Sequence, residues 1–137
     1  MAIDKLIVIP SDLNFIKKVS EEVLGSLQPF KLGAYELLDI RLCLEEALIN
    51  AIKYGNKFDN DLKVKVKYSV ENNILKLIIE DEGEGFDFNG LPDPTLEENL
   101  QELKGRGVFL IKRLMDEVYF NEKGNRITML KNITGRE

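Results

Sequence analysis

The fold is decided by the stretch LEEALINAIKYGN, residues 44–56, near the middle of the chain. Apolar residues recur there and just upstream every three or four positions, which is the spacing of a buried helix stripe. These positions are Leu37, Ile40, Leu44, Leu48 and Ala51. Gly55-Asn56 is a typical helix stop. The sequence therefore predicts one long helix from about residue 33 to 54, with Glu46 and Asn50 on one face.

Shorter patterns on either side predict the remaining elements. Alternating or short apolar runs bounded by turn residues indicate strands. A further apolar repeat with helical spacing follows Ser11 or Asp12 and predicts another helix. The expected strands are residues 3–9, 62–70, 74–80, 118–120 and 126–130, and a third helix is expected over 107–115. This order predicts one α+β domain over residues 1–137. It would be a two-layer α/β sandwich with a mixed, mostly antiparallel sheet and helices on one face.

Composition restricts the classes of function. The 137 residues include no histidine and one cysteine, and the net charge is −5. The missing histidine excludes Ser–His triads, His–Cys zinc sites and a phospho-accepting histidine. The acidic balance argues against nucleic-acid binding, and no apolar run is long enough to span a membrane. Cys43 is expected in the core, and a cytoplasmic location is the default for such a chain.

Glu46 and Asn50 are the first candidate site residues. An amide oxygen such as that of Asn50 is a hard ligand suited to Mg²⁺, and a carboxylate one turn away can accept a proton from an attacking hydroxyl. Lys53 and Tyr54 are expected to continue this face by another turn. Taken alone, the pattern is more often just the polar face of an amphipathic helix.

Asp81 and the glycines after it form the second candidate. Asp81 ends an apolar strand, and its carboxylate can accept a hydrogen bond from the exocyclic amine of a purine. Gly83 and Gly85 would let the backbone pass close to the ring. The alternative is an ordinary acidic turn, in which Asp-x-Gly-x-Gly is common.

Gly105-Arg106-Gly107 forms the third candidate, at the expected start of a helix. Helix N–H groups and the positive end of the helix dipole favour phosphate, and Arg106 can add a bidentate contact or stabilise charge during transfer. The alternative is a flexible helix entry. Residues 82–104, before it, lack regular periodicity, and a loop of that length in a compact domain is usually functional or mobile.

Together these segments resemble the ATPase superfamily of gyrase, histidine kinases and mismatch-repair ATPases. Residues 44–56 resemble its N-box, residues 81–87 its first glycine box and residues 105–111 its second. Leu91-Pro92-Asp93-Pro94 and the run from Gly105 to Val118 more narrowly resemble the bacterial anti-sigma factor serine/threonine-protein kinases. The resemblance implies the histidine kinase-like (Bergerat) fold.

The resemblance also implies roles for individual residues. Glu46 would be the general base, with Arg106 assisting transfer, and Asn50 would bind Mg²⁺. Asp81 would bind the adenine amine, and residues 87–104 would form an ATP lid. The remaining nucleotide contacts would come from Lys53, Tyr54, Gly83, Gly85, Phe86, Gly105, Gly107, Val108 and Thr128. Many members have histidine where this chain has Tyr54, whereas histidine kinases often have Lys-Tyr there.

The implied activity is transfer of phosphate from ATP to serine or threonine of an anti-anti-sigma (STAS-type) protein. The implied partners are that substrate, a sigma factor held by the kinase, and a second copy of the chain in a homodimer. Two alternatives remain open. One is a non-catalytic, nucleotide-gated binding switch, and the other is a stand-alone catalytic module of the histidine kinase type.

Overall fold

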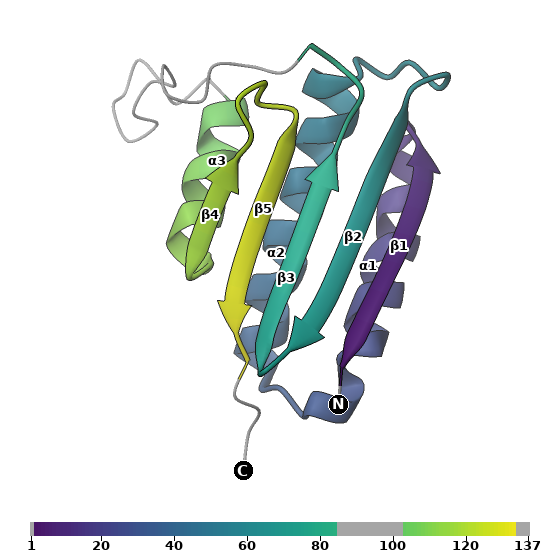
Figure 1. The fold of residues 1–137 in the computed structure, drawn as a ribbon. Helices are drawn as coiled ribbons and strands as arrows, with labels where there is room; N and C mark the ends of the chain where they lie inside the picture. The colour runs from purple at the N-terminus through teal and green to yellow at the C-terminus, as the bar shows by residue number, and fades with distance from the viewer. Residues whose placement is uncertain (1, 85–102, 134–137) are drawn as a thin grey trace.

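The protein forms two layers, a sheet and three helices that cover one of its faces (Figure 1). A computed structural model describes residues 2–84 and 103–133. The strands are β1 (Ile3–Pro10), β2 (Lys63–Glu71), β3 (Ile74–Glu80), β4 (Glu117–Phe120) and β5 (Arg126–Asn132). The helices are α1 (Ile16–Ser26), α2 (Ala34–Ile49) and α3 (Leu103–Leu114), with short turns η1 (Leu13–Phe15) and η2 (Gln28–Phe30) and a π-helix, η3 (Asn50–Gly55).

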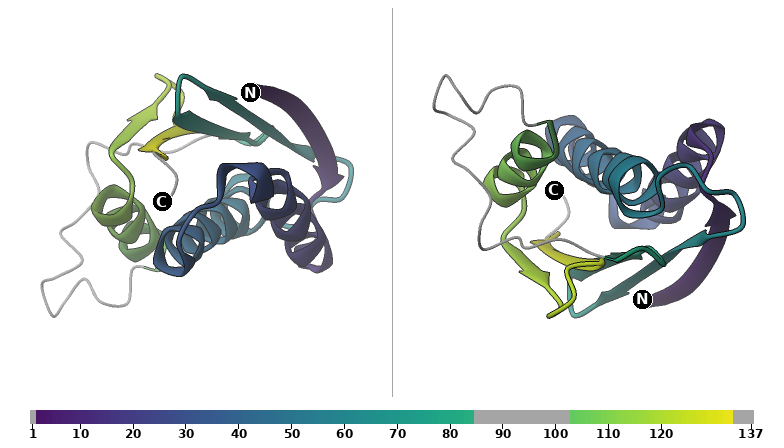
Figure 2. Two further views of the ribbon diagram at one scale, coloured as in Figure 1. Left: turned by 90° about the horizontal axis from the view of Figure 1, so that it is seen from below. Right: turned by 90° about the horizontal axis from the view of Figure 1, so that it is seen from above.

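The sheet has five strands in the order β1-β2-β3-β5-β4, and all neighbouring pairs are antiparallel. The two views in Figure 2 show the helices on the same side of it, while the other face has no covering layer of described residues. The predicted fold class is therefore confirmed, with an antiparallel rather than a mixed sheet.

Alternation of side chains determines which face of the sheet is buried. Along β2, Val64, Val66, Tyr68 and Val70 are buried, whereas the lysines between them are exposed. The buried side chains pack against the apolar stripes of α1 and α2, which include Val23, Ile40, Leu44 and Leu48. The expected core role of Cys43 is also confirmed, because its side chain is fully buried.

Turn residues fix the connections that the sequence predicts. Asn72 and Asn73 both have positive φ, at 54° and 63°, as a tight two-residue hairpin between β2 and β3 requires. The Asp12 side chain accepts a hydrogen bond from the Asn14 N–H at 2.9 Å and so caps η1, which leads into α1. No helix among the described residues is long and apolar enough to cross a membrane.

Four chain segments lie at the same end of the sheet because of the directions in which the helices and strands run. The C-terminal end of α2 with η3, the end of β3, the β4–β5 hairpin and the start of α3 all lie there (Figure 1). The three candidate segments of the sequence are thus at the same end of the molecule.

Candidate nucleotide site

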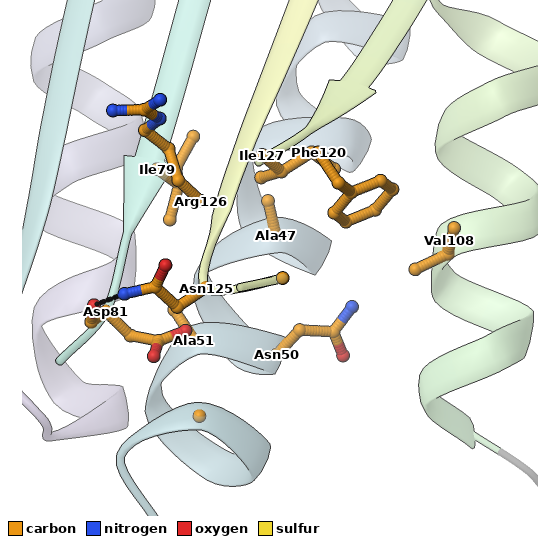
Figure 3. A pocket seen from close by; sticks show the side chains of 12 residues that line it. Ala47, Asn50, Ala51, Ile79, Asp81, Val108, Phe120, Asn125, Arg126 and Ile127 are labelled. Carbon is orange, nitrogen blue, oxygen red and sulfur yellow. Dashed lines mark hydrogen bonds between the residues drawn. The ribbon is translucent and has the colours of Figure 1, made fainter. Parts of the chain in front are cut away.

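A pocket lies between α2 with η3, α3 and the ends of β3 and β5 (Figure 3). Its empty space is about 420 Å³ and is partly open to solvent. The lining residues are Ala47, Asn50, Ala51, Gly55, Ile79, Asp81, Val108, Phe120, Gly124, Asn125, Arg126 and Ile127. Most of these side chains are apolar or small, and the polar ones are Asn50, Asp81, Asn125 and Arg126. Such a lining suits a flat heterocycle with a few directed polar contacts.

Asp81 supplies the carboxylate of this pocket. It is 9% exposed and follows β3 directly, as the sequence predicts. The Gly83 N–H donates to its Oδ1 at 2.8 Å, so that the carboxylate is oriented by its own turn. A Cβ atom on Gly55 would lie 2.8 Å from the same Oδ1, so the absence of a side chain at position 55 allows Asp81 to pack against η3.

Gly83 is required by a close backbone contact. A Cβ atom at this position would lie 2.6 Å from the Gly55 carbonyl carbon. The first glycine of the predicted glycine box therefore lets the turn after β3 pack directly on η3. The expected contacts of Gly85 and Phe86 lie outside the described residues, as does the predicted ATP lid except for residues 103 and 104, which belong to α3.

Asn50 presents a ligand atom to the pocket. Its Oδ1 is buried and has no hydrogen-bond partner among residues 2–84 and 103–133. A buried amide oxygen without a partner costs about 1–3 kcal/mol, which a bound ligand can offset. Among the described residues there is no cluster of three or more acidic or cysteine side chains that could hold a metal ion without further ligands. Asn50 together with phosphate oxygens matches the usual sparse protein coordination of Mg²⁺.

The end of the long helix differs from the prediction. The sequence predicts α-helix to residue 54, but a π-helix begins at Asn50, and the Asn56 N–H donates to the Ala51 carbonyl five residues back at 2.8 Å. This wider turn puts Asn50, Ala51 and Gly55 along one pocket wall. π-Turns within helices are rare and occur often at functional sites.

Lys53 and Tyr54 lie in the same π-helix. Lys53 is exposed, and its Nζ lies 5.4 Å from the centroid of the Tyr54 ring. Neither residue lines the pocket in this structure. Because the π-helix changes the spacing of side chains, Lys53 and Tyr54 do not share this pocket wall with Asn50, and their contacts with a nucleotide remain a prediction.

Glu46 lies against α3. A Cβ atom on Gly107 would be 2.7 Å from both Cγ and Cδ of Glu46, so the glutamate packs directly on the α3 backbone. Its partly buried position, one turn before Asn50, puts the carboxylate on the side of α2 that faces α3. Val108, the next residue of α3, is 3% exposed and lines the pocket.

The start of α3 also differs from the prediction. The helix begins at Leu103 rather than at Gly107, so Gly105, Arg106 and Gly107 lie within its first turns. Glycine is disfavoured in helices but is not excluded from them. The two glycines of this segment therefore did not mark the N-terminal end of α3. The second glycine box therefore provides helical backbone, and Gly107 provides the close approach to Glu46.

The hairpin between β4 and β5 supplies pocket residues that sequence reasoning missed. Phe120, Asn125, Arg126 and Ile127 all line the pocket, although the sequence identified this region only as a turn and a strand. Thr128, the predicted contact, is not among the lining residues. It alternates with the buried Ile127 and Met129 along β5 and therefore faces the other side of the sheet.

Comparison with known proteins agrees with this geometry. Residues 9–131 match the Histidine kinase-like ATPase domain family. The chain is 32% identical to serine-protein kinase RsbW of Bacillus subtilis over 107 residues, which cover 73% of this chain and 67% of that protein. It is 27% identical to serine-protein kinase RsbW of Staphylococcus epidermidis and 26% identical to that of Staphylococcus aureus, over 91% of this chain and 84% of each relative. The chain therefore belongs to the histidine kinase-like ATPase family, within the group of bacterial anti-sigma factor serine/threonine-protein kinases that its sequence motifs predict.

Proposed function

We propose that this protein is an ATP-dependent serine/threonine-protein kinase of the cytoplasm. Its substrate would be an anti-anti-sigma protein of the STAS type, and it would also sequester a sigma factor. The observation that carries the proposal is the placement of Glu46 against Gly107, one helical turn before the unpartnered buried oxygen of Asn50. A pocket that only bound nucleotide would need no carboxylate at that position.

The base of ATP would occupy the pocket between Ile79, Ala51 and Val108. Apolar side chains on both sides of a flat ring contribute by burial of apolar surface. The Asp81 carboxylate would accept a hydrogen bond from the exocyclic amine of adenine. Guanine presents a carbonyl oxygen at that ring position, which a carboxylate would repel.

The phosphates would extend from the pocket toward Asn50 and the first turns of α3. Asn50 Oδ1 would hold Mg²⁺ together with phosphate oxygens, and the ion would neutralise charge on the phosphates. The backbone of Gly105 and Gly107 and the guanidinium of Arg106 would contact the phosphates from the side of α3. Because Gly107 also supports Glu46, the same helix would organise both the phosphates and the carboxylate.

Transfer would proceed by attack of a serine or threonine hydroxyl oxygen on the γ-phosphorus. The new O–P bond forms as the bond between that phosphorus and the β,γ-bridging oxygen breaks, and ADP leaves. The hydroxyl proton passes to the Glu46 carboxylate, and Arg106 would stabilise the charge on the transferred group. Positioning and charge stabilisation account for most of the catalysis in such reactions.

Transfer of labelled γ-phosphate from ATP to the anti-anti-sigma substrate tests this proposal. Glu46→Gln should retain ATP binding and lose transfer, because the amide cannot accept the proton. Glu45→Gln is the matched control, since Glu45 pairs with Arg41 at 3.2 Å on the exposed side of the same helix turn. Unchanged transfer in Glu46→Gln would remove Glu46 as the base. Binding of ATP without any transfer by the unmodified protein would favour a non-catalytic binding switch.

The proposed homodimer has a candidate surface in the face of the sheet opposite the helices. No described element covers this face (Figure 2). Leu6 and Val8 pair with the exposed Lys67 and Lys65 of β2 and so lie on it, at 61% and 51% exposed. Tyr119 pairs with Thr128 on the same face and is 52% exposed. We propose a second copy of the chain as the occupant. Light scattering should report a dimer, which Leu6→Asp should convert to monomer, whereas Leu38→Asp, at an exposed leucine of α2, should not. A monomeric unmodified protein would contradict the dimer.

A further inference from the structure

The peptide bond between Asp81 and Glu82 is held on both sides by asparagine side chains. The Nδ2 of Asn125 donates to the Asp81 carbonyl oxygen at 2.8 Å. The Glu82 N–H donates to the Oδ1 of Asn56, also at 2.8 Å. These two backbone groups belong to one planar peptide unit. With both ends of the unit bonded, rotation of the backbone directly after Asp81 is restricted.

Asn56 is itself fixed by its surroundings. It is 1% exposed, and its Nδ2 donates to the Ser11 Oγ at 2.9 Å and to the Lys63 carbonyl oxygen at 3.0 Å. The Ser11 hydroxyl in turn donates to the Leu62 carbonyl oxygen at 2.6 Å. Both amide hydrogens of Asn56 are therefore used, which orients its oxygen toward Glu82. This amide connects the pocket to β2 and to the end of β1.

Asn125 is fixed in the same way from the β4–β5 hairpin. Its Oδ1 accepts from the Nδ2 of Asn121 at 2.7 Å, which turns its own Nδ2 toward Asp81. The Asn121 Oδ1 accepts from the backbone N–H groups of Gly124, Asn125 and Arg126 at 2.9 to 3.1 Å and so orders the hairpin. The Asn125 carbonyl oxygen also accepts from the Asp81 N–H at 2.9 Å.

This arrangement determines where the Asp81 carboxylate lies. The carboxylate is attached to the clamped backbone, and its Oδ1 accepts from the Gly83 N–H one residue beyond the clamped peptide. We infer that Asn56 and Asn125 are positioning residues that hold the Asp81 carboxylate against the exocyclic amine of adenine and so determine selectivity for adenine nucleotides. The inference rests on the proposed nucleotide site, but it assigns roles to two residues that neither glycine box contains.

The test compares two nucleotides on the full chain with Mg²⁺ present. One is ATP, and the other is purine riboside triphosphate, which lacks only the exocyclic amine. Asn56→Ala and Asn125→Ala should each raise the Kd for ATP by about tenfold, the effect of losing one positioned hydrogen bond, while the Kd for the analogue changes by less than about threefold. The preference of the unmodified protein for ATP should therefore shrink in both variants.

Two further variants separate positioning from damage to the fold. Asn132→Ala, at the exposed far end of β5, is the matched asparagine control and should retain the full preference for ATP. Ser11→Ala removes one bond to Asn56 without touching the pocket, and it should reduce the preference by a smaller factor. Thermal melting of each variant reports whether it folds. If Asn56→Ala does not fold, Asn125→Ala and Ser11→Ala still provide the comparison.

The possible results distinguish this inference from the proposed function. Equal weakening of both nucleotides in the clamp variants would overturn the inference, because it would show a general structural role. Unchanged preference for ATP in both folded variants would overturn it as well. If the unmodified protein binds neither nucleotide, the proposed function fails, and the inference fails with it. Loss of the preference in both variants, with full preference in Asn132→Ala, would support it.

Discussion

Substitution of Gly107 by alanine tests whether α3 holds Glu46 in place. The added Cβ atom would lie 2.7 Å from Cγ and Cδ of Glu46 and closer still to its Oε2, whereas ordinary contacts of such an atom are 3.4–4 Å. The carboxylate would have to move by about 1 Å for its Oε2 to reach an ordinary contact distance, or α3 would have to move by a similar distance. Either movement changes the position of the proposed base relative to the phosphates.

The size of the effect follows from this displacement. A misplacement of about 1 Å at a reacting centre can cost roughly a hundredfold in rate. We therefore expect kcat for phosphoryl transfer in Gly107→Ala to fall by about 10- to 100-fold, which corresponds to about 1.4–2.7 kcal/mol. The Kd for ATP should change by less than about threefold, because alanine retains the backbone groups proposed to contact the phosphates and the contacts to the base at Asp81 are unaffected. Alanine is a better helix former than glycine, so a weakened α3 is not expected to be the cause of the loss.

Steady-state transfer of labelled phosphate gives kcat, and calorimetric titration with ATP gives Kd. Gly25→Ala is the matched control, because this glycine is also in a helix and an added Cβ atom would have no neighbour within 4 Å. It should leave kcat unchanged and make the protein slightly more stable. If Gly107→Ala retained its kcat but lost tenfold in ATP affinity, Gly107 would contact the phosphates without positioning Glu46.

Three further predictions concern single positions. Gly55→Ala should raise the Kd for ATP by about tenfold in calorimetry, because the added Cβ atom would overlap the Asp81 carboxylate and displace it. An unchanged Kd would show that Asp81 does not bind the base. Asn50→Leu should raise the melting temperature of the nucleotide-free protein and weaken ATP binding only when Mg²⁺ is present, and equal weakening with EDTA would remove Asn50 as the ligand. Burial, followed by the Asp39 carboxylate, raises the pKa of the Cys43 thiol from 9.0 to about 12. As the pH rises, the thiol of the unfolded chain therefore loses its proton at a lower pH than the thiol of the folded chain. The free energy of unfolding should decline between these two pH values by up to about 1.4 kcal/mol per pH unit. Urea unfolding at pH 8 and pH 10 should show this decline in the unmodified protein and a smaller one in Cys43→Ala.

Sequence periodicity predicted the order of elements because each element has a buried face with its own repeat. The residues that alternate in β2 and those in the apolar stripe of α2 are the ones buried in the structure, because the sheet and the helices pack those faces against each other. Asp81 was predicted at the site because it follows the end of an apolar strand, whereas Val108 was predicted only from the resemblance of residues 105–111 to the second glycine box. Local pattern therefore accounts for the fold and for the part of the site that lies where a strand or a helix ends.

The π-helix and the asparagine clamp were not predictable in the same way. Six residues are too few for apolar spacing to distinguish a π-turn from an α-turn, so residues 50–54 were expected to continue the α-helix. Asn56 and Asn125 resemble ordinary stop and turn residues, and their roles arise from hydrogen bonds between segments far apart in the chain. Thr128 was expected from the resemblance to contact the nucleotide. The alternation of side chains along β5 instead turns it to the face of the sheet opposite the pocket.

The two ends of the site differ in how their polar groups are satisfied. Around Asp81 the amides of Asn56 and Asn125 make their hydrogen bonds within the protein, which fixes the geometry before a ligand arrives and lowers the entropic cost of recognising the base. Asn50, toward the proposed phosphate end, has a buried oxygen without a partner among the described residues, which destabilises the empty site. A preorganised base end would provide selectivity, whereas an unsatisfied oxygen at the proposed phosphate end would provide affinity that depends on the metal. The protein would therefore recognise which nucleotide is bound at one end and whether it carries Mg²⁺ at the other.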